Sequence, residues 1–282
     1  NCYAKSKPGF HMSKINSILI MIVCFFMSCS PSNNSESISK SGSNQVNETK
    51  LIFDIDSLLN KEKLDTIQIK LDWVTKKANK RYKGVSTKYL FSKLITNHKI
   101  DTTNKEVIFL CKDGYSARVP FYQLLTEKGY LVNKDVDARL QWDEEIDEKF
   151  TPCYLVWSID KDENNFSFPY GIIQIKIVDI DEEYKDANPI NGTQNVHKGF
   201  SIFKKQCIKC HPINKVGGVV GPELNTPMNV TEYWKIEHLE SFILNPDKYR
   251  YNSKMPTIHD LSNNDVKLII EYLKHMSKNK KF

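Results

Sequence analysis

The chain has 282 residues, enough for about two domains of ordinary size. Hydrophobic residues make up 40% of it and charged residues 26%, which is typical of a globular protein and excludes a wholly disordered chain. The formal net charge is +6, and the lysines are spread along the whole sequence rather than clustered, so we expect no nucleic-acid partner.

The amino-terminal segment has the pattern of an export signal. Met12 and Lys14 precede an apolar run that extends from Ile15 to Cys29. A basic start followed by such a run is typical of a secretory signal peptide, and the run is shorter than the roughly 20 apolar residues that span a bilayer. We expect residues 1–11 to be upstream sequence or a fragment edge, and we exclude residues 1–29 from the fold.

A small residue and Cys29 close the apolar run, and Ser and Asn follow at once. This arrangement resembles a bacterial lipobox, in which the cysteine is lipidated after cleavage. The resemblance implies a lipid anchor on Cys29 and an exported protein on the periplasmic side of a bacterial membrane. Ordinary cleavage and a retained signal anchor are the alternatives. Residues 30–50, rich in Ser and Asn, predict a flexible tether.

Residues 51–180 predict an α+β domain that is richer in strand than in helix. Alternation from Ile67 to Trp73 predicts a half-buried strand, and Ser86 before apolar residues at 90–95 predicts a capped helix. Other segments predict further elements: strands at 107–110, 153–157 and 172–180, a turn at 113–115 and a helix at 121–127. In the last strand, Ile173, Ile175 and Ile177 alternate with polar residues, as in a half-buried strand.

Four short segments occur in this domain, in the order Lys83-Gly84-Val85, Asp113-Gly114-Tyr115, Pro152–Trp157 and Pro169-Tyr170-Gly171. They resemble the molybdopterin-binding domain of sulfite-oxidase-like enzymes. The resemblance implies one cysteine ligand for molybdenum, for which Cys111 is a better candidate than Cys153. The domain is about half the usual catalytic unit and has no dense Arg/His cluster for the pterin pyrophosphate. We therefore expect a cofactor-free domain, with structural cysteines or a Cys111–Cys153 disulfide.

Residues 181–195 are polar, contain Pro189 and Gly192, and predict a linker.

The second domain, residues 196–282, contains Cys207-Ile208-Lys209-Cys210-His211, a CxxCH motif. Two thiols at this spacing reach the two vinyl groups of one haem, and the adjacent histidine lies beneath the iron. A thioredoxin-like redox pair does not require the histidine, and no βαβ pattern surrounds this motif.

Several features flank the motif in order. A helix at 196–206 has Val196, Phe200 and Phe203 on one face, and Gly221-Pro222-Glu223-Leu224 follows the motif. A helix is predicted at 231–244, ending before Pro246. Lys254-Met255-Pro256 comes next, and Ser262 caps a closing helix. The closing helix has an apolar stripe: Val266, Ile269, Ile270, Leu273 and Met276.

This ordered set resembles the class I c-type cytochromes, which are all-α. The resemblance implies one haem c, attached covalently through Cys207 and Cys210. It implies that His211 is one axial iron ligand, oriented by the carbonyl oxygen of Pro222, and that Met255 is the other. Gly199-Phe200 resembles the pair at which the first helix of these cytochromes crosses the last.

Other residues are candidates for the sixth ligand of the iron. Met228 also follows a proline, and His238 and His259 would give ligation by two histidines. Met255 would then only pack against the ring. Several lysines lie near the motif in sequence and would attract acidic partners if they surrounded the haem edge: Lys204, Lys205, Lys209, Lys215 and Lys254.

We expect an electron carrier that serves one or more redox partner proteins and performs no substrate chemistry itself. The α+β domain would then act in docking. One alternative is a fused molybdenum oxidoreductase that passes electrons from metal on Cys111 to its own haem. A second alternative is a haem-based redox or gas sensor, which requires an open sixth position on the iron.

Overall fold

The structure is a computed structural model that describes residues 50–138, 147–159 and 165–282, all of which belong to one compact unit. The proposed signal segment, Cys29 and all but the last residue of the tether lie outside the described residues. Within the described ranges, none of the helices combines the length and the apolar character needed to cross a membrane.

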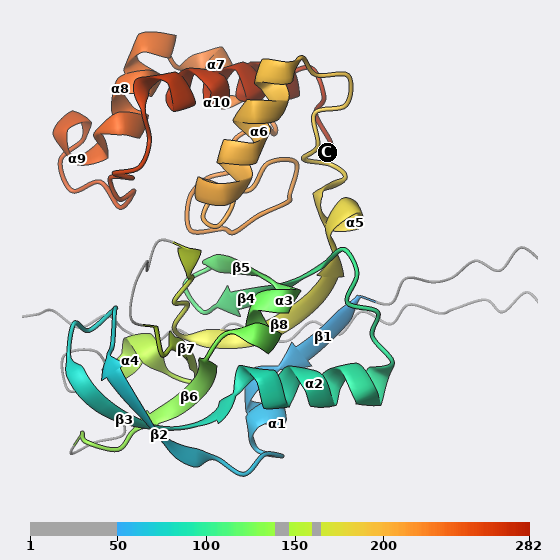
Figure 1. Ribbon diagram of the computed structural model, residues 1–282. Helices are drawn as coiled ribbons and strands as arrows, with labels where there is room; N and C mark the ends of the chain where they lie inside the picture. The colour runs from blue at the N-terminus through green and yellow to red at the C-terminus, as the bar shows by residue number, and fades with distance from the viewer. Residues whose placement is uncertain (1–49, 139–146, 160–164) are drawn as a thin grey trace, which may run out of the picture. The chain divides into compact units, whose positions relative to one another are not determined.

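The amino-terminal part contains two antiparallel sheets of four strands each (Figure 1). The first sheet has the order β1-β8-β4-β5, with bounds Leu51–Asp54, Ile172–Asp179, Lys105–Cys111 and Ser116–Pro120. The second has the order β2-β3-β6-β7, with bounds Asp65–Leu71, Ala78–Ser86, Gly129–Asp135 and Tyr154–Trp157. Four helices accompany the sheets: α1 (Ile55–Leu59), α2 (Thr87–His98), α3 (Phe121–Thr126) and α4 (Asp147–Phe150). The expected strand-rich α+β part is therefore confirmed.

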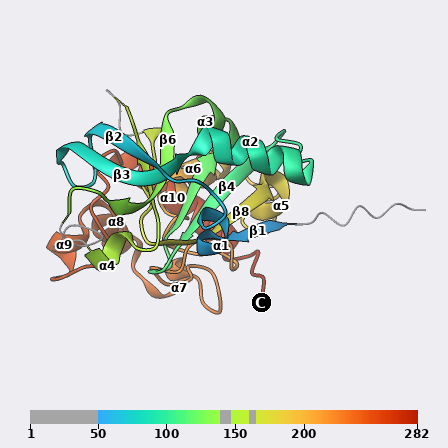
Figure 2. The same ribbon diagram turned by 90° about the horizontal axis from the view of Figure 1, so that it is seen from below.

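The second sheet is covered on both faces, which explains the unbroken apolar run in β7. Leu155 and Trp157 belong to the main core, where they join Phe91 of α2 and Phe109 of β4. Tyr154 and Val156 point into a smaller core on the opposite face. All residues of β7 are buried, as expected for a strand that lies between two apolar layers. Figure 2 shows α2 and the strands of this part from below.

Two local expectations in this part were wrong. The pairing of β4 with β8 shifts register at Cys111, which lies opposite Ile172. This bulge places Ile172 in the core and leaves Ile173 43% exposed, so the alternation expected from Ile173 is broken there. At the start of α2, Ser86 occupies the N-cap position, but its side chain makes no capping hydrogen bond.

The carboxyl-terminal part is helical and has its own core. Its elements are α5 (Ile180–Tyr184), α6 (Gln194–Gln206), α7 (Val230–Tyr233), α8 (Ile236–Leu244), α9 (Pro246–Tyr249) and α10 (Asn263–Met276). Helices α6 and α10 cross (Figure 1) at Gly199, where a Cβ atom would overlap the carbonyl oxygen of Leu268. Helix α10 begins with a capping box between Ser262 and Asp265, and its predicted apolar stripe is buried.

The segment expected to link the two parts packs into the helical core. Tyr184 is 4% exposed and Ala187 is fully buried. The Tyr184 ring lies 6.2 Å from the ring of Phe200, and the Tyr272 hydroxyl donates to the Ala187 carbonyl oxygen at 2.7 Å. This stretch of chain is thus held by side chains of α6 and α10.

The single helix expected at 231–244 is two helices. Asn229 caps α7 in a capping box with Glu232, and the backbone becomes extended at Trp234 before α8 begins. The Trp234 ring packs 5.3 Å from that of Phe242 and 6.1 Å from that of Tyr249. Helix α8 ends before Pro246 as expected, but Pro246 also begins the short helix α9, since proline fits the first helical turn.

Candidate functional site

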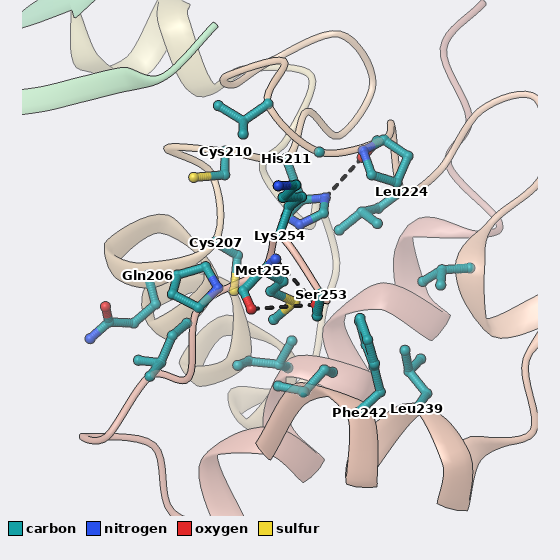
Figure 3. A pocket seen from close by; sticks show the side chains of 18 of the residues that line it. Gln206, Cys207, Cys210, His211, Leu224, Leu239, Phe242, Ser253, Lys254 and Met255 are labelled. Carbon is teal, nitrogen blue, oxygen red and sulfur yellow. Dashed lines mark hydrogen bonds between the residues drawn. The ribbon is translucent and has the colours of Figure 1, made fainter. Parts of the chain in front are cut away.

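The CxxCH segment follows directly from the end of α6. The Cys207 amide donates to the Phe203 carbonyl oxygen at 2.8 Å, which continues the helical hydrogen bonding. The amides of Cys210 and His211 then both donate to the Cys207 carbonyl oxygen, at 3.0 and 2.9 Å. This tight turn brings both thiols and the His211 imidazole to one cavity, which they line together (Figure 3).

The His211 ring is oriented by the Gly221-Pro222 loop. Its Nδ1 atom lies 3.0 Å from the Pro222 carbonyl oxygen, so the hydrogen bond implied by the sequence is present. A Cβ atom on Gly221 would overlap the imidazole, which explains the glycine at this position. Burial lowers the pKa of His211, although the bond to Pro222 opposes this shift. The neutral imidazole that results is the form that binds iron.

Glu223 holds the same loop in place. One of its carboxylate oxygens accepts from the amides of Asn214 and Asn225, and the other accepts from the amide of Lys215, all at 2.9 Å. The Asn225 amide group in turn donates to the Asn214 side-chain oxygen at 2.7 Å. Sequence reasoning assigned no such role to Glu223 and did not single out Asn214 or Asn225, because the two buried asparagines contact the loop in a way that the local pattern does not reveal.

The cavity has a volume of about 890 Å³. Such a volume lies in the range of sites that hold cofactors. Its walls are largely apolar side chains of the helical part, among them Phe203, Trp234, Leu239, Phe242, Ile269 and Leu273. Two thiols, one oriented imidazole and an apolar lining fit a covalently attached haem with its ring out of water.

Met255 lines this cavity together with His211 (Figure 3). Its amide donates to the Ser253 hydroxyl oxygen at 3.2 Å, and its side chain is partly buried. Met228 is 55% exposed and does not line the cavity. His238 and His259 are also exposed and lie outside its lining. Of the residues considered for the sixth iron position, Met255 alone lines the described cavity.

The lysines near the motif do not act as one group. Lys209 and Lys254 line the cavity, as does Arg250, which sequence reasoning missed. The Lys204 ammonium instead lies 4.8 Å from the centre of the Tyr184 ring. Lys205 and Lys215 are exposed and are not part of the lining.

The cysteines of the α+β part do not line this cavity. Cys111 and Cys153 are buried free thiols, so the disulfide left open by the sequence is not formed in this structure. Burial raises the pKa of the Cys111 thiol to about 12, and burial also raises the pKa of Cys153. Both cysteines are members of the main core of the α+β part, which fits a structural role.

A helical part whose first and last helices cross, with a CxxCH turn, an oriented histidine and an apolar cavity, defines a c-type haem domain. Residues 194–273 match the family described as cytochrome c oxidase, cbb3-type, subunit III. Cytochrome c of Theileria annulata is 32% identical over 97 residues, covering 28% of this chain and 84% of that protein. Cytochrome c of Theileria parva is 31% identical over 97 residues, with the same shares covered.

Through this part, the chain belongs to the cytochrome c family. Covalently bound haem c is therefore its cofactor, and one haem suits its single cytochrome domain.

Proposed function

We propose that the protein is a monohaem electron carrier with His211 and Met255 as the two axial ligands of the iron. The observation that carries the proposal is that both side chains line one cavity with Cys207 and Cys210. When bound, the haem supplies an iron that gains or loses one electron. The chain would hold it covalently, orient His211 through Pro222, and keep water from the ring with apolar walls.

Ligation by two side chains favours electron transfer over sensing or catalysis. If His211 and Met255 both bind the iron, no iron position would stay open for a gas or a substrate. A thioether ligand also favours the reduced iron and raises the reduction potential. Electrons would come from one redox partner protein and pass to another, and Lys209, Lys254 and Arg250 at the cavity would favour an acidic partner surface.

The α+β part would serve as a non-catalytic docking domain. We propose, as a finer point, that it is a cofactor-free relative of sulfite-oxidase-like domains. The proposal is supported by the order of its segments: Lys83–Val85 before α2, the turn Asp113–Tyr115 between β4 and β5, and Pro152 before β7. The burial of Cys111 in the core of this part supports a structural role for that cysteine.

A redox titration of the haem-loaded full chain tests electron transfer against the alternatives. The proposal predicts a reversible one-electron couple, no carbon monoxide adduct of the reduced protein at low gas concentrations, and no molybdenum. Ready carbon monoxide binding would favour the sensor. Molybdenum near one atom per chain would favour the fused oxidoreductase.

We further propose export and anchoring through a lipid on Cys29, supported by the signal pattern of residues 12–29 and the polar tether after it. Expression of the full chain with its signal, followed by separation of membranes, tests this directly. Cys29→Ser is expected to abolish metabolic labelling by a fatty acid, whereas Cys24→Ser, in the same apolar run, is expected to leave it unchanged. Labelling that persists in Cys29→Ser would refute the anchor.

A further inference from the structure

The turn between β4 and β5 contacts the haem-attachment segment through main-chain hydrogen bonds. The Ser116 amide donates to the carbonyl oxygen of Lys209, inside the CxxCH motif, at 2.9 Å. The Val219 amide, just after the motif, donates to the Gly114 carbonyl oxygen, also at 2.9 Å. Each segment thus donates one bond and accepts one, so the CxxCH segment is tied to the α+β part.

Glycines on both sides make this close approach possible. Gly114 has φ +90°, a conformation that side-chain-bearing residues rarely adopt, and a Cβ there would lie 2.8 Å from a methyl carbon of Val219. A Cβ on Gly218 would overlap the Lys209 carbonyl oxygen and lie 3.0 Å from that of Gly114. The two backbones are in direct contact, with no space for a side chain between them.

Tyr115 lies in the middle of this contact. Its ring packs against the core of the α+β part and also lines the cavity that Cys210, His211 and Met255 line. Burial raises the pKa of Tyr115, whose side chain lines the cavity together with that of Cys210. Tyr115 is the residue that the α+β part contributes to the described lining.

A second contact holds the two parts at a separate point. Arg118, on β5, forms ion pairs with Glu106 of β4 and Glu183 of α5, both at 3.1 Å. Its guanidinium also lies 4.9 Å from the centre of the Tyr184 ring, against which Lys204 of α6 is placed at 4.8 Å. Strand β5, which follows Tyr115 directly, is thus attached to the helical part at a second point, through Arg118.

We propose that Tyr115 is a positioning residue of the haem site: its ring closes the cavity beside Cys210, and its turn fixes the CxxCH segment. This inference rests on the proposed function. An aromatic wall at this edge excludes water, and lower solvent access favours the less charged, reduced iron. The α+β part would then raise the reduction potential of a haem that is attached to the other part.

Variants of the haem-loaded full chain test this role. Tyr115→Ala is expected to lower the midpoint potential, with unchanged haem per chain and an unchanged methionine–iron band. Tyr115→Phe is expected to keep a potential near that of the wild type, because the ring is retained. Tyr122→Ala is the matched control, since Tyr122 lies on α3 and is 67% exposed. Hydrogen–deuterium exchange of the segment 207–221 is expected to be faster in Tyr115→Ala only.

A wild-type potential together with wild-type exchange in Tyr115→Ala would overturn the inference. If Tyr115→Ala does not fold, Gly114→Ala gives the same test, because its Cβ would press on Val219 and loosen the same turn. Failure of the proposed function is distinguishable: the wild-type protein itself would then lack a reversible couple. In that case, the exchange of segment 207–221 still decides whether Tyr115 fixes the loop.

Discussion

At the scale of single residues, the site depends on how one imidazole is held. His211 is adjacent to Cys210, so attachment of the haem brings its ring close to the iron. The direction of the ring is set by the Pro222 carbonyl oxygen, 3.0 Å from Nδ1. A hydrogen bond to the second ring nitrogen fixes the tautomer and raises the basicity of the ligand nitrogen. Gly221 matters because it leaves room for the ring.

Gly221→Ala is therefore expected to displace His211 without altering the motif. The added methyl group would overlap the imidazole. The affinity of His211 for the iron should then fall by about 10–100-fold, the range seen when residues that support a metal ligand are lost. The fraction of low-spin haem in the visible spectrum measures this effect. Met228→Ala is the control, because Met228 is exposed and lies outside the cavity lining. A fully low-spin Gly221→Ala protein would contradict the assigned role.

At the scale of elements, the start of α10 shows how a local signal fixes a helix. The Ser262 hydroxyl oxygen accepts from the Asp265 amide at 3.1 Å, and the Asp265 carboxylate accepts from the Ser262 amide at 2.9 Å. Ser262→Ala removes this cap and is expected to reduce the free energy of unfolding by about 1 kcal/mol.

Denaturant unfolding of the haem-loaded protein measures this change, with Ser201→Ala in the interior of α6 as the control. Alanine is the better helix former at that exposed position, so no loss of stability is expected there. Equal losses in both variants would show that the cap has no special role.

Elements with strong local periodicity could be predicted from the sequence. Helices α6 and α10 have apolar stripes that match their buried faces. Strand β4 was recognisable instead by a short continuous apolar run, most of which is buried. Elements whose form depends on residues distant in the sequence could not be predicted in this way. The bulge at Ile173 arises in the pairing of β8 with β4, and the break at Trp234 accompanies ring contacts with Phe242 and Tyr249.

The same distinction applies to the site. Cys207, Cys210 and His211 lie within five consecutive residues, so their chemistry could be recognised from the sequence alone. Met255 was predicted as a ligand through the order of motifs that resembles the cytochromes, and the structure places it in the cavity lining. Tyr115 could not be predicted to line the same cavity, because it lies in the other part of the chain and no local pattern links it to CxxCH.

At the scale of the whole molecule, Arg118 joins the two parts through ion pairs whose side chains are largely buried. Its side chain is 6% exposed, and those of Glu106 and Glu183 are 11% and 13% exposed. Arg118→Ala would leave both carboxylates buried without this partner. Removal of one member of a buried ion pair destabilises by about 3–5 kcal/mol, and we expect a loss in free energy of unfolding of that size.

Arg81→Ala provides the matched comparison. Arg81 pairs with Asp137, but its side chain is 54% exposed, so solvent screens the pair. A loss of at most about 1 kcal/mol is expected there. Denaturant unfolding of both variants gives the comparison, and similar losses would show that Arg118 does not join the two parts as proposed.

The most direct test of the central claim is the oxidised visible spectrum of the haem-loaded full chain, together with its haem count. The account predicts one haem per chain and a methionine–iron charge-transfer band. Met255→Ala should lose the band and have a lower potential, whereas Met228→Ala should keep both. A wild-type protein without the band, or a Met255→Ala protein that retains it, would contradict His211/Met255 ligation and the proposed electron carrier.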